Sequence, residues 1–279
     1  MQKRKRKLVR KSKPSAGFKY RKPLWIAIAI LFLFGIGYHY RNGLAYYFSF
    51  KSDKILREEK RLADIRNLEV IHSHPALVVG IDVSEYQGTI NWTDVDSIAG
   101  RPIGFAFIRA TAGRDKIDRR FNRNWESAKQ ANMLRGAYHY YRPDENSLEQ
   151  AQNFITAVKL KNGDLPPVLD IEQISKVQSV DSLKRGLRKW LVAVEKHYNV
   201  RPIIYSGERY YTDFLQEEFK DYVFWIANYN FFVESIKPGW TFWQFTEKGS
   251  VPGIQGPVDV NLYNGTPKML GYLTIINAE

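Results

Sequence analysis

Two carboxylates placed two residues apart could do acid–base chemistry in this chain. Asp170 and Glu172 end the run PPVLDIE, in which apolar residues precede them and Ile171 separates them. On a β-strand, residues two apart point to the same face. If that face is poorly solvated, desolvation and mutual repulsion raise the pKa of at least one carboxyl group. A protonated acid beside a carboxylate is the arrangement that glycoside hydrolysis requires.

The same pair has two other interpretations, a solvated strand end without chemistry or a site for a divalent cation such as Mg²⁺. Two further acids, Asp82 and Asp259, lie in the β-rich runs VVGIDVS and VDVNLY. Taken alone, Asp82 is explained as a helix N-cap or a buried structural partner, and Asp259 as a turn residue. The four acids become a candidate site only if the fold brings them together.

The order of the expected elements predicts such a fold. Strand–helix alternation implies a parallel sheet, and eight strands in this order predict a closed barrel that is irregular in its last third. In a parallel barrel the active site lies at the C-terminal mouth, where strand-end acids meet. Strands are expected at 78–84, 103–111, 136–142, 167–172, 202–206, 222–229, 240–245 and 258–263, and helices near 92–99, 119–134, 147–160, 180–197 and 208–219.

The chain before the barrel divides into three parts, a basic cytoplasmic tail (1–22), a transmembrane helix (23–40) and a stalk with a charged helix (41–76), and the barrel occupies 77–279. The uncharged run with Trp25 and Tyr38 near its ends predicts a membrane-spanning helix, and the basic tail predicts a cytoplasmic N-terminus. We therefore expect a single-pass membrane protein whose barrel lies on the periplasmic or wall side. A cleavable signal peptide is the alternative, but bulky residues follow the run instead of a small-x-small site.

The net charge of +13 is concentrated in the tail. Residues 1–22 contain 11 Lys and Arg and no acid, which leaves 31 basic against 29 acidic residues in the rest of the chain. A nucleic-acid-binding protein would spread its basic residues over the folded surface, so no nucleic-acid partner is expected. The chain has no cysteine, which excludes disulfides and thiolate chemistry.

The acids lie within a series of motifs that resembles glycoside hydrolase family 25, the Chalaropsis-type lysozymes. The resemblance spans about residues 77–264. It implies an α/β fold, the irregular TIM-like (β/α)5β3 barrel, here preceded by the transmembrane helix. The motifs are GIDVSEYQGTINW (80–92), FIRATAG (107–113), GAYHY (136–140), PPVLDIE (166–172), FWIANY (224–229), WQF (243–245) and VDVN (258–261).

The resemblance also implies an activity, the hydrolysis of the β-1,4 bond between N-acetylmuramic acid and N-acetylglucosamine in peptidoglycan. Glu172 matches the family's general acid, and Asp170 matches the second carboxylate, a nucleophile or a stabiliser of the intermediate. Asp82 and Asp259 match acids that line the cleft. No metal or organic cofactor is expected. A membrane-tethered peptidoglycan-binding module without turnover is the alternative.

Several polar and aromatic residues in the family motifs are expected near the strand ends. Ring stacking or hydrogen bonds to sugar are one role for them, and packing of the barrel is the other. We expect His139 to be packed or hydrogen-bonded rather than catalytic, and Asp118 to serve loop structure. The partners expected are peptidoglycan strands and, through the N-terminal helix, the membrane, with the protein a monomer. The candidate sugar-binding residues are Tyr138, Tyr140, Trp225, Tyr229 and Gln244.

Overall fold

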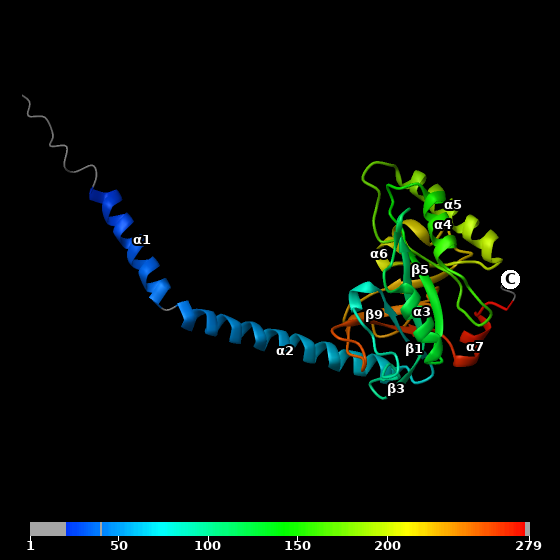
Figure 1. Ribbon diagram of the computed structural model, residues 1–279, viewed down its shortest axis with the longest axis horizontal. Helices are drawn as coiled ribbons and strands as arrows, with labels where there is room; N and C mark the ends of the chain where they lie inside the picture. The colour runs from blue at the N-terminus through cyan, green and yellow to red at the C-terminus, as the bar shows by residue number, and fades with distance from the viewer. Residues whose placement is uncertain (1–20, 40, 277–279) are drawn as a thin grey trace, which may run out of the picture. The chain divides into compact units, whose positions relative to one another are not determined.

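The computed structural model describes residues 21–39 and 41–276 (Figure 1). The chain forms two compact units, residues 1–59 and residues 60–279. In the described part of the first unit lie helix α1 (Arg21–His39) and the start of helix α2 (Arg41–Ser73). Nearly all of the expected cytoplasmic tail, residues 1–20, lies outside the described residues.

The expected transmembrane helix at 23–40 is not supported. Among the described helices, none combines the length and the apolar character that crossing a bilayer demands. Helix α1 has 19 residues, and its sequence begins with Arg21 and Lys22 and ends with His39. The prediction of a transmembrane helix is therefore wrong.

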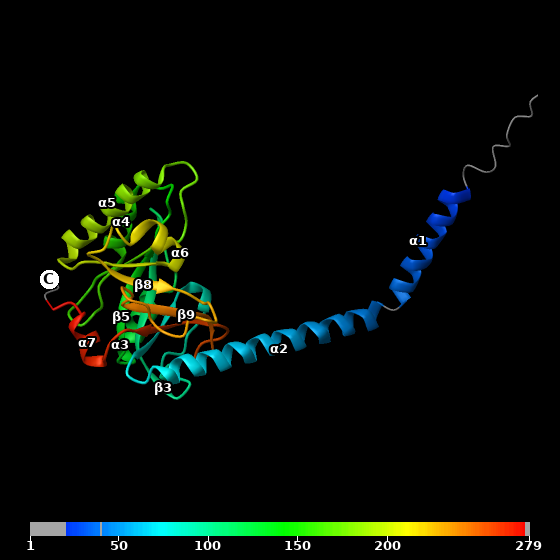
Figure 2. The same cartoon turned by 180° about the vertical axis from the view of Figure 1, so that it is seen from behind.

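The second unit is a closed barrel of eight strands (Figures 1 and 2). Strand β1 pairs with both β10 and β3, which closes the sheet on itself. Two short strands, β2 (Ser97–Ile98) and β4 (Lys116–Ile117), flank β3 outside the barrel. The barrel strands are β1 (Val78–Val83), β3 (Arg101–Ala112), β5 (Leu134–Tyr140), β6 (Val168–Asp170), β7 (Ile203–Gly207), β8 (Val223–Ala227), β9 (Phe242–Gly249) and β10 (Val258–Tyr263).

The strand directions correct the expected architecture. All neighbours from β1 through β3 and β5 to β9 run parallel, but β10 is antiparallel to both β9 and β1. A TIM barrel has parallel strands, each followed by a helix. Here only the 3₁₀ turn η2 (Glu85–Gln87) follows β1, and the chain reverses between β9 and β10 without a crossover helix. The predicted TIM-like barrel preceded by a transmembrane helix is thus wrong, and the fold is a closed mixed β-barrel.

Most helices of the second unit cover the outside of the barrel (Figure 1), whereas the last one places Leu270 in the cluster inside it. Helix α5 shows why: Leu183, Leu187, Trp190, Leu191 and Val194 form one buried face at helical spacing, and Ser179 caps its N-terminus. The helices are α3 (Phe121–Gln130), α4 (Ser147–Ala157), α5 (Val180–Tyr198), α6 (Glu208–Tyr210) continuing into the π-helical turn η3 (Tyr211–Leu215), and α7 (Pro267–Tyr272).

One of the expected helices does not form, and another is shorter than expected. Near 92–99 the chain forms turns and strand β2 instead of a helix. There, Thr93 Oγ1 donates to Asn91 Oδ1 at 2.8 Å and Asn91 Nδ2 donates to Asp94 Oδ2 at 2.8 Å, so short polar side chains stabilise a turn that competes with the helix. The helix expected at 208–219 is limited to α6 and η3.

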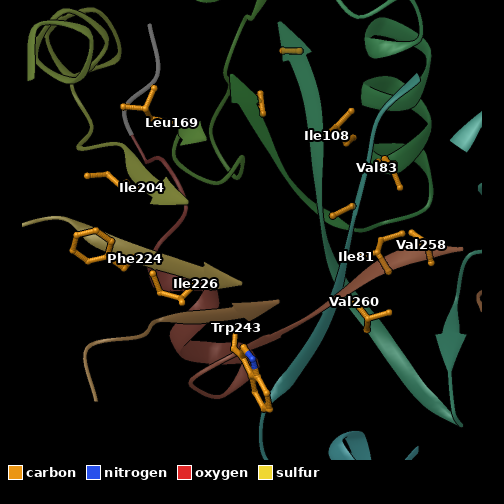
Figure 3. Close-up of a cluster of buried hydrophobic side chains, with 14 of the residues drawn as sticks. Ile81, Val83, Ile108, Leu169, Ile204, Phe224, Ile226, Trp243, Val258 and Val260 are labelled. Carbon is orange, nitrogen blue, oxygen red and sulfur yellow. The ribbon is translucent and has the colours of Figure 1, made fainter. Parts of the chain in front are cut away.

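Buried apolar side chains form two layers, one on each face of the closed sheet. The outer layer lies between strands and helices, and Figure 3 shows members such as Ile81, Ile108 and Trp243 on different strands. The inner layer fills the barrel with alternating residues that include Phe105, Phe107, Trp225 and Phe242. Gly80 belongs to this face, because a Cβ there would lie 2.3 Å from the Phe105 ring. The strand period of two therefore decides which side chains enter the barrel.

Candidate active site

The inward-facing positions change from apolar to polar toward one mouth of the barrel. On β1 the inward series runs through Val78 and Gly80 to Asp82, and on β3 it runs through Phe105 and Phe107 to Arg109. The mouth opens into a cavity of about 540 Å³. All nine residues expected in the site line this cavity: Asp82, Tyr138, Tyr140, Asp170, Glu172, Trp225, Tyr229, Gln244 and Asp259.

Asp82 and Asp259 form one hydrogen-bonded pair of acids. They are direct partners in the antiparallel pairing of β1 and β10. Burial, and then the charge of Asp82, raise the pKa of Asp259, while burial raises the pKa of Asp82 and its hydrogen bonds oppose that rise. Because Gln244 and Asn261 also donate hydrogen bonds to Asp82 and favour its ionised form, the proton of the pair lies on Asp259, which donates it to Asp82.

Two buried amides complete the surroundings of Asp82. Gln244 Nε2 and Asn261 Nδ2 donate to Asp82 Oδ2 at 2.7 and 2.8 Å. Each amide is itself oriented by its carbonyl oxygen: Asn261 Oδ1 accepts from Trp225 Nε1 at 2.8 Å, and Gln244 Oε1 accepts from two tyrosines. This network fixes the direction from which Asp82 can act.

The Asp170–Glu172 pair lies on the opposite side of the mouth, at the end of β6. Asp170 is 5% exposed, and its Oδ1 finds no hydrogen-bond donor among the residues that the structure describes. Burial raises its pKa well above the usual value, the charges of Glu172 and Asp82 raise it further, and Arg109 opposes them. Glu172 is exposed at the rim of the cavity, and its pKa is raised by partial loss of hydration and by the charge of Asp82.

The aromatic candidates occupy different depths. Trp225 is buried and stacks on Phe107 with ring centroids 4.5 Å apart, so it forms the floor of the cavity. Tyr138 and Tyr140 are half-buried, and the Tyr140 hydroxyl accepts from Gln173 Nε2 at 3.0 Å. Tyr229 is 42% exposed, and its hydroxyl donates to Gln244 Oε1 at 2.6 Å. The deeper rings pack the barrel, and the outer ones remain accessible to a ligand.

Sequence reasoning missed three residues of this site. Tyr205 donates to Gln244 Oε1 at 2.6 Å, and Asn261 binds Asp82 as described. Arg109 lines the cavity, donates from Nε to Asp118 Oδ2 at 3.0 Å, and supplies the positive charge nearest the acids. Strand parity could have found all three, because Tyr205 faces inward like Ile203, Asn261 like Asp259, and Arg109 like Phe107.

Arg109 belongs to a group of charges beside the mouth. Glu85 lies 3.4 Å from Arg109 and 2.6 Å from Lys116, and its pKa is lowered to about 2 by hydrogen bonds from Lys116 and Arg119. Asp118, expected to serve loop structure, is buried and accepts from the backbone N–H of Glu85 at 2.8 Å. These acids are fully engaged by cations and by the backbone, which separates them from the four acids of the cavity.

His139 points away from the cavity, as expected for a packed histidine. Its ring stacks on Trp190 at 5.4 Å and hydrogen-bonds Thr111 Oγ1 and Gln150 Oε1. Burial lowers its pKa to about 4, so the ring is neutral at ordinary pH. Within the described part of the chain, His, Asp and Glu side chains form no group of three or more that could hold a metal ion.

Paired acids of which one keeps its proton are the arrangement that carbohydrate-cleaving enzymes use in acid–base catalysis. The sequence profile of Glycosyl hydrolases family 25 matches residues 81–254. The chain belongs to this family and is a glycoside hydrolase of the lysozyme type.

Known proteins agree with this assignment. Lysozyme M1 of Streptomyces globisporus is 35% identical over 208 residues, which cover 69% of this chain and 70% of that protein. The uncharacterised protein YegX of Escherichia coli (strain K12) is 41% identical over 194 residues, covering 68% and 71%. The crystal structure of a bacterial lysozyme from Streptomyces coelicolor has a TM-score of 0.64 at 32% identity, covering 71% of this chain and 96% of that one.

Proposed function

We propose that the barrel hydrolyses peptidoglycan at the β-1,4 bond between N-acetylmuramic acid and N-acetylglucosamine. The observation that carries the proposal is the cavity itself, in which four acids with raised pKa values face one another in a family 25 barrel. Lysozyme M1 of Streptomyces globisporus, which is similar over most of the barrel, supports peptidoglycan as the substrate.

Glu172 is the proposed general acid. It lies at the accessible rim of the cavity, and its raised pKa keeps it protonated at a pH where an ordinary carboxyl group has lost its proton. It protonates the glycosidic oxygen as the bond to the leaving sugar breaks, so that this sugar departs as an alcohol. The same carboxylate then accepts a proton from the water that attacks the anomeric carbon.

Asp170 is the proposed nucleophile or stabiliser of the positive charge that develops on the sugar ring. Asp170 lines the cavity, its buried Oδ1 has no hydrogen-bond donor among the described residues, and the positive charge of Arg109 favours the ionised form. Because Asp170 and Glu172 repel each other when both are ionised, the pair holds one proton over a wide pH range. One carboxylate and one acid are thereby present together.

The sugar-binding role of Tyr138, Tyr140, Trp225, Tyr229 and Gln244 is part of the same proposal. Accessible rings at the rim offer stacking surfaces for sugar, and the deeper Trp225 and Gln244 position Asn261 and Asp82. Since peptidoglycan lies outside the cytoplasm, the proposed function places the working barrel there as well, which fractionation with protease accessibility tests.

Purified full-length protein is assayed on purified sacculi for new reducing ends and released muropeptides. Release of fragments ending in reducing N-acetylmuramic acid supports the proposal, and reducing N-acetylglucosamine ends would contradict the bond assigned. A peptidoglycan-binding module without turnover would instead bind sacculi, unchanged by Glu172→Gln, and release nothing at any pH.

A further inference from the structure

Helix α2 contributes a buried arginine to the wall of the barrel. Arg66 is 9% exposed and lies in the part of α2 that belongs to the barrel unit. Its Nη1 donates to the carbonyl oxygen of Tyr229 at 2.7 Å and to that of Phe245 at 3.0 Å, and its Nη2 donates to that of Asn230 at 2.7 Å. One guanidinium thus binds three carbonyl groups more than 160 residues away.

These carbonyl groups flank the active site. Tyr229 lines the cavity, and its hydroxyl donates to Gln244 Oε1 at 2.6 Å. Gln244, the neighbour of Phe245 in β9, donates in turn to Asp82. The chain of contacts therefore runs from Arg66 outside the barrel, through Tyr229 and Gln244, to a carboxylate inside it.

The segment after β8 depends on such an anchor. Beyond Asn230 the chain runs through Phe231 and Phe232, which are 58% and 86% exposed. Three hydrogen bonds of Asn228 hold the chain before it: its N donates to Gln244 O at 3.0 Å, its O accepts from Trp243 Nε1 at 3.0 Å, and its Nδ2 donates to Glu208 Oε2. A segment with an exposed continuation has low local stability unless buried contacts fix it. Arg66 fixes it at the residue whose side chain enters the cavity.

We propose that Arg66 is a positioning residue of the active site, which sets the place of Tyr229 at the rim and so the binding of the sugar chain. The proposal rests on the proposed muramidase function. Residue 66 lies before the stretch 81–254 that matches the family, so the support that α2 gives the barrel comes from outside the matched stretch. The substrate-binding edge of the cavity is then built jointly by the segment after β8, by β9 and by α2.

The test compares Arg66→Met with the matched control Asn67→Ala in the full-length protein. Asn67 is also buried on α2 and donates from Nδ2 to the carbonyl oxygen of Lys248 at 3.2 Å, away from Tyr229. Arg66→Met is expected to raise KM on solubilised glycan strands about five- to tenfold with kcat changed less than about threefold. Asn67→Ala is expected to lower thermal stability but to leave KM unchanged.

A double-variant cycle separates positioning from general damage. If Arg66 acts through Tyr229, Arg66→Met combined with Tyr229→Phe raises KM no more than the larger single effect. If the KM increases of the two single variants multiply in the double variant, the proposal is overturned. It is also overturned if Asn67→Ala raises KM as much as Arg66→Met does. If Arg66→Met does not fold, Arg66→Lys replaces it, because a lysine restores the charge but not the fixed fork of donors, and an intermediate KM is expected.

Hydrogen exchange gives a readout that does not depend on activity. Arg66→Met is expected to speed amide exchange in 228–233, while Asn67→Ala leaves it unchanged there; unchanged exchange in Arg66→Met would overturn the positioning role. If the wild-type protein cleaves no peptidoglycan while Arg66→Met still speeds exchange in 228–233, the proposed substrate is contradicted and the role of Arg66 in anchoring the segment is supported.

Discussion

The two acid pairs in the cavity differ in how the protein treats them. On the wall made by β1 and β10, Asp82 accepts hydrogen bonds from Gln244 and Asn261 and shares the proton of Asp259. On the wall made by β6, Asp170 is equally buried, but its Oδ1 has no donor among the described residues. On the first wall, the hydrogen-bonding capacity of Asp82 is used within the protein. On the second wall, that of Asp170 is left partly unused.

This difference assigns different tasks to the walls. A buried carboxylate without partners destabilises the folded protein, and such groups persist where function requires them. A carboxylate held by fixed amides contributes a stationary charge instead. We therefore expect substitutions on the β6 wall to abolish the reaction and substitutions on the β1–β10 wall to tune it.

The largest expected effect is that of Glu172→Gln. It removes the group that protonates the leaving oxygen, and kcat on sacculi is expected to fall about 10³-fold, within the range that general acid catalysis contributes. Glu217→Gln, an exposed carboxylate outside the cavity, serves as the control. If Glu172→Gln retained turnover, another residue would be the general acid, and the two walls would not differ in the way proposed.

Removal of the fixed charge is expected to shift the pH profile. The charge of Asp82 contributes to the raised pKa of Glu172, so Asp82→Asn lowers that pKa. Since the general acid works protonated, the alkaline limb of kcat/KM moves to lower pH, and the rate at the optimum falls about 10²-fold. Asp94→Asn removes an exposed charge elsewhere as the control. A limb that stays in place, or moves to higher pH, would show that Asp82 does not act on Glu172.

A smaller effect is expected from Gln244→Leu. This change removes a donor to Asp82 and leaves the hydroxyl groups of Tyr205 and Tyr229 without their acceptor. Activity is expected to fall about tenfold, in keeping with one lost hydrogen bond to a charged group. The burial of Asp82 is then less compensated, so its pKa rises further. An activity equal to that of wild type would mean that Asn261 alone holds Asp82.

The smallest effect is on stability, and it has opposite signs on the two walls. The folded-state pKa of Asp170 is raised, so ionisation destabilises the folded protein, and stability falls as pH rises from the unfolded pKa toward the folded one. Asp170→Asn removes this penalty and is expected to raise the free energy of unfolding at neutral pH by about 1 kcal/mol.

Asp82→Asn is expected to lower that free energy, because an amide at this position would point a donor at two amides that already donate. Chemical denaturation of both variants at pH 4 and pH 7 measures the difference. If both variants are stabilised at pH 7, the hydrogen bonds from the two amides do not compensate the cost of burying the Asp82 carboxylate.

Strand parity predicted much of the site from the sequence alone. The eight runs of β-forming residues all became barrel strands, and Asp170 and Glu172 both line the cavity, although β6 ends at Asp170 and Glu172 follows it. The direction of the last strand could not be predicted this way. Asp259 reaches the mouth because β10 runs opposite to its neighbours, so the start of this strand lies beside Asp82. Hydrophobic alternation is the same in both directions and carries no information on it.

Two other features depend on long-range contacts that local patterns do not encode. The buried role of Arg66 was hidden because α2 has a mostly polar, charged sequence, and the arginine is buried by its contacts with the segment after β8 and with β9. The failed helix near 92–99 shows the reverse case, in which hydrogen bonds among neighbouring short polar side chains override the helical spacing.

The pairing of β10 with β1 also constrains when the enzyme can become active during its synthesis. The first strand of the barrel carries Asp82, but the residues that hold this acid, Asn261 and Asp259, are translated almost two hundred residues later on β10. A nascent chain that lacks β10 has an open barrel and an unsupported Asp82. Catalysis by the barrel therefore has to wait until the last strand has been made and has paired with the first.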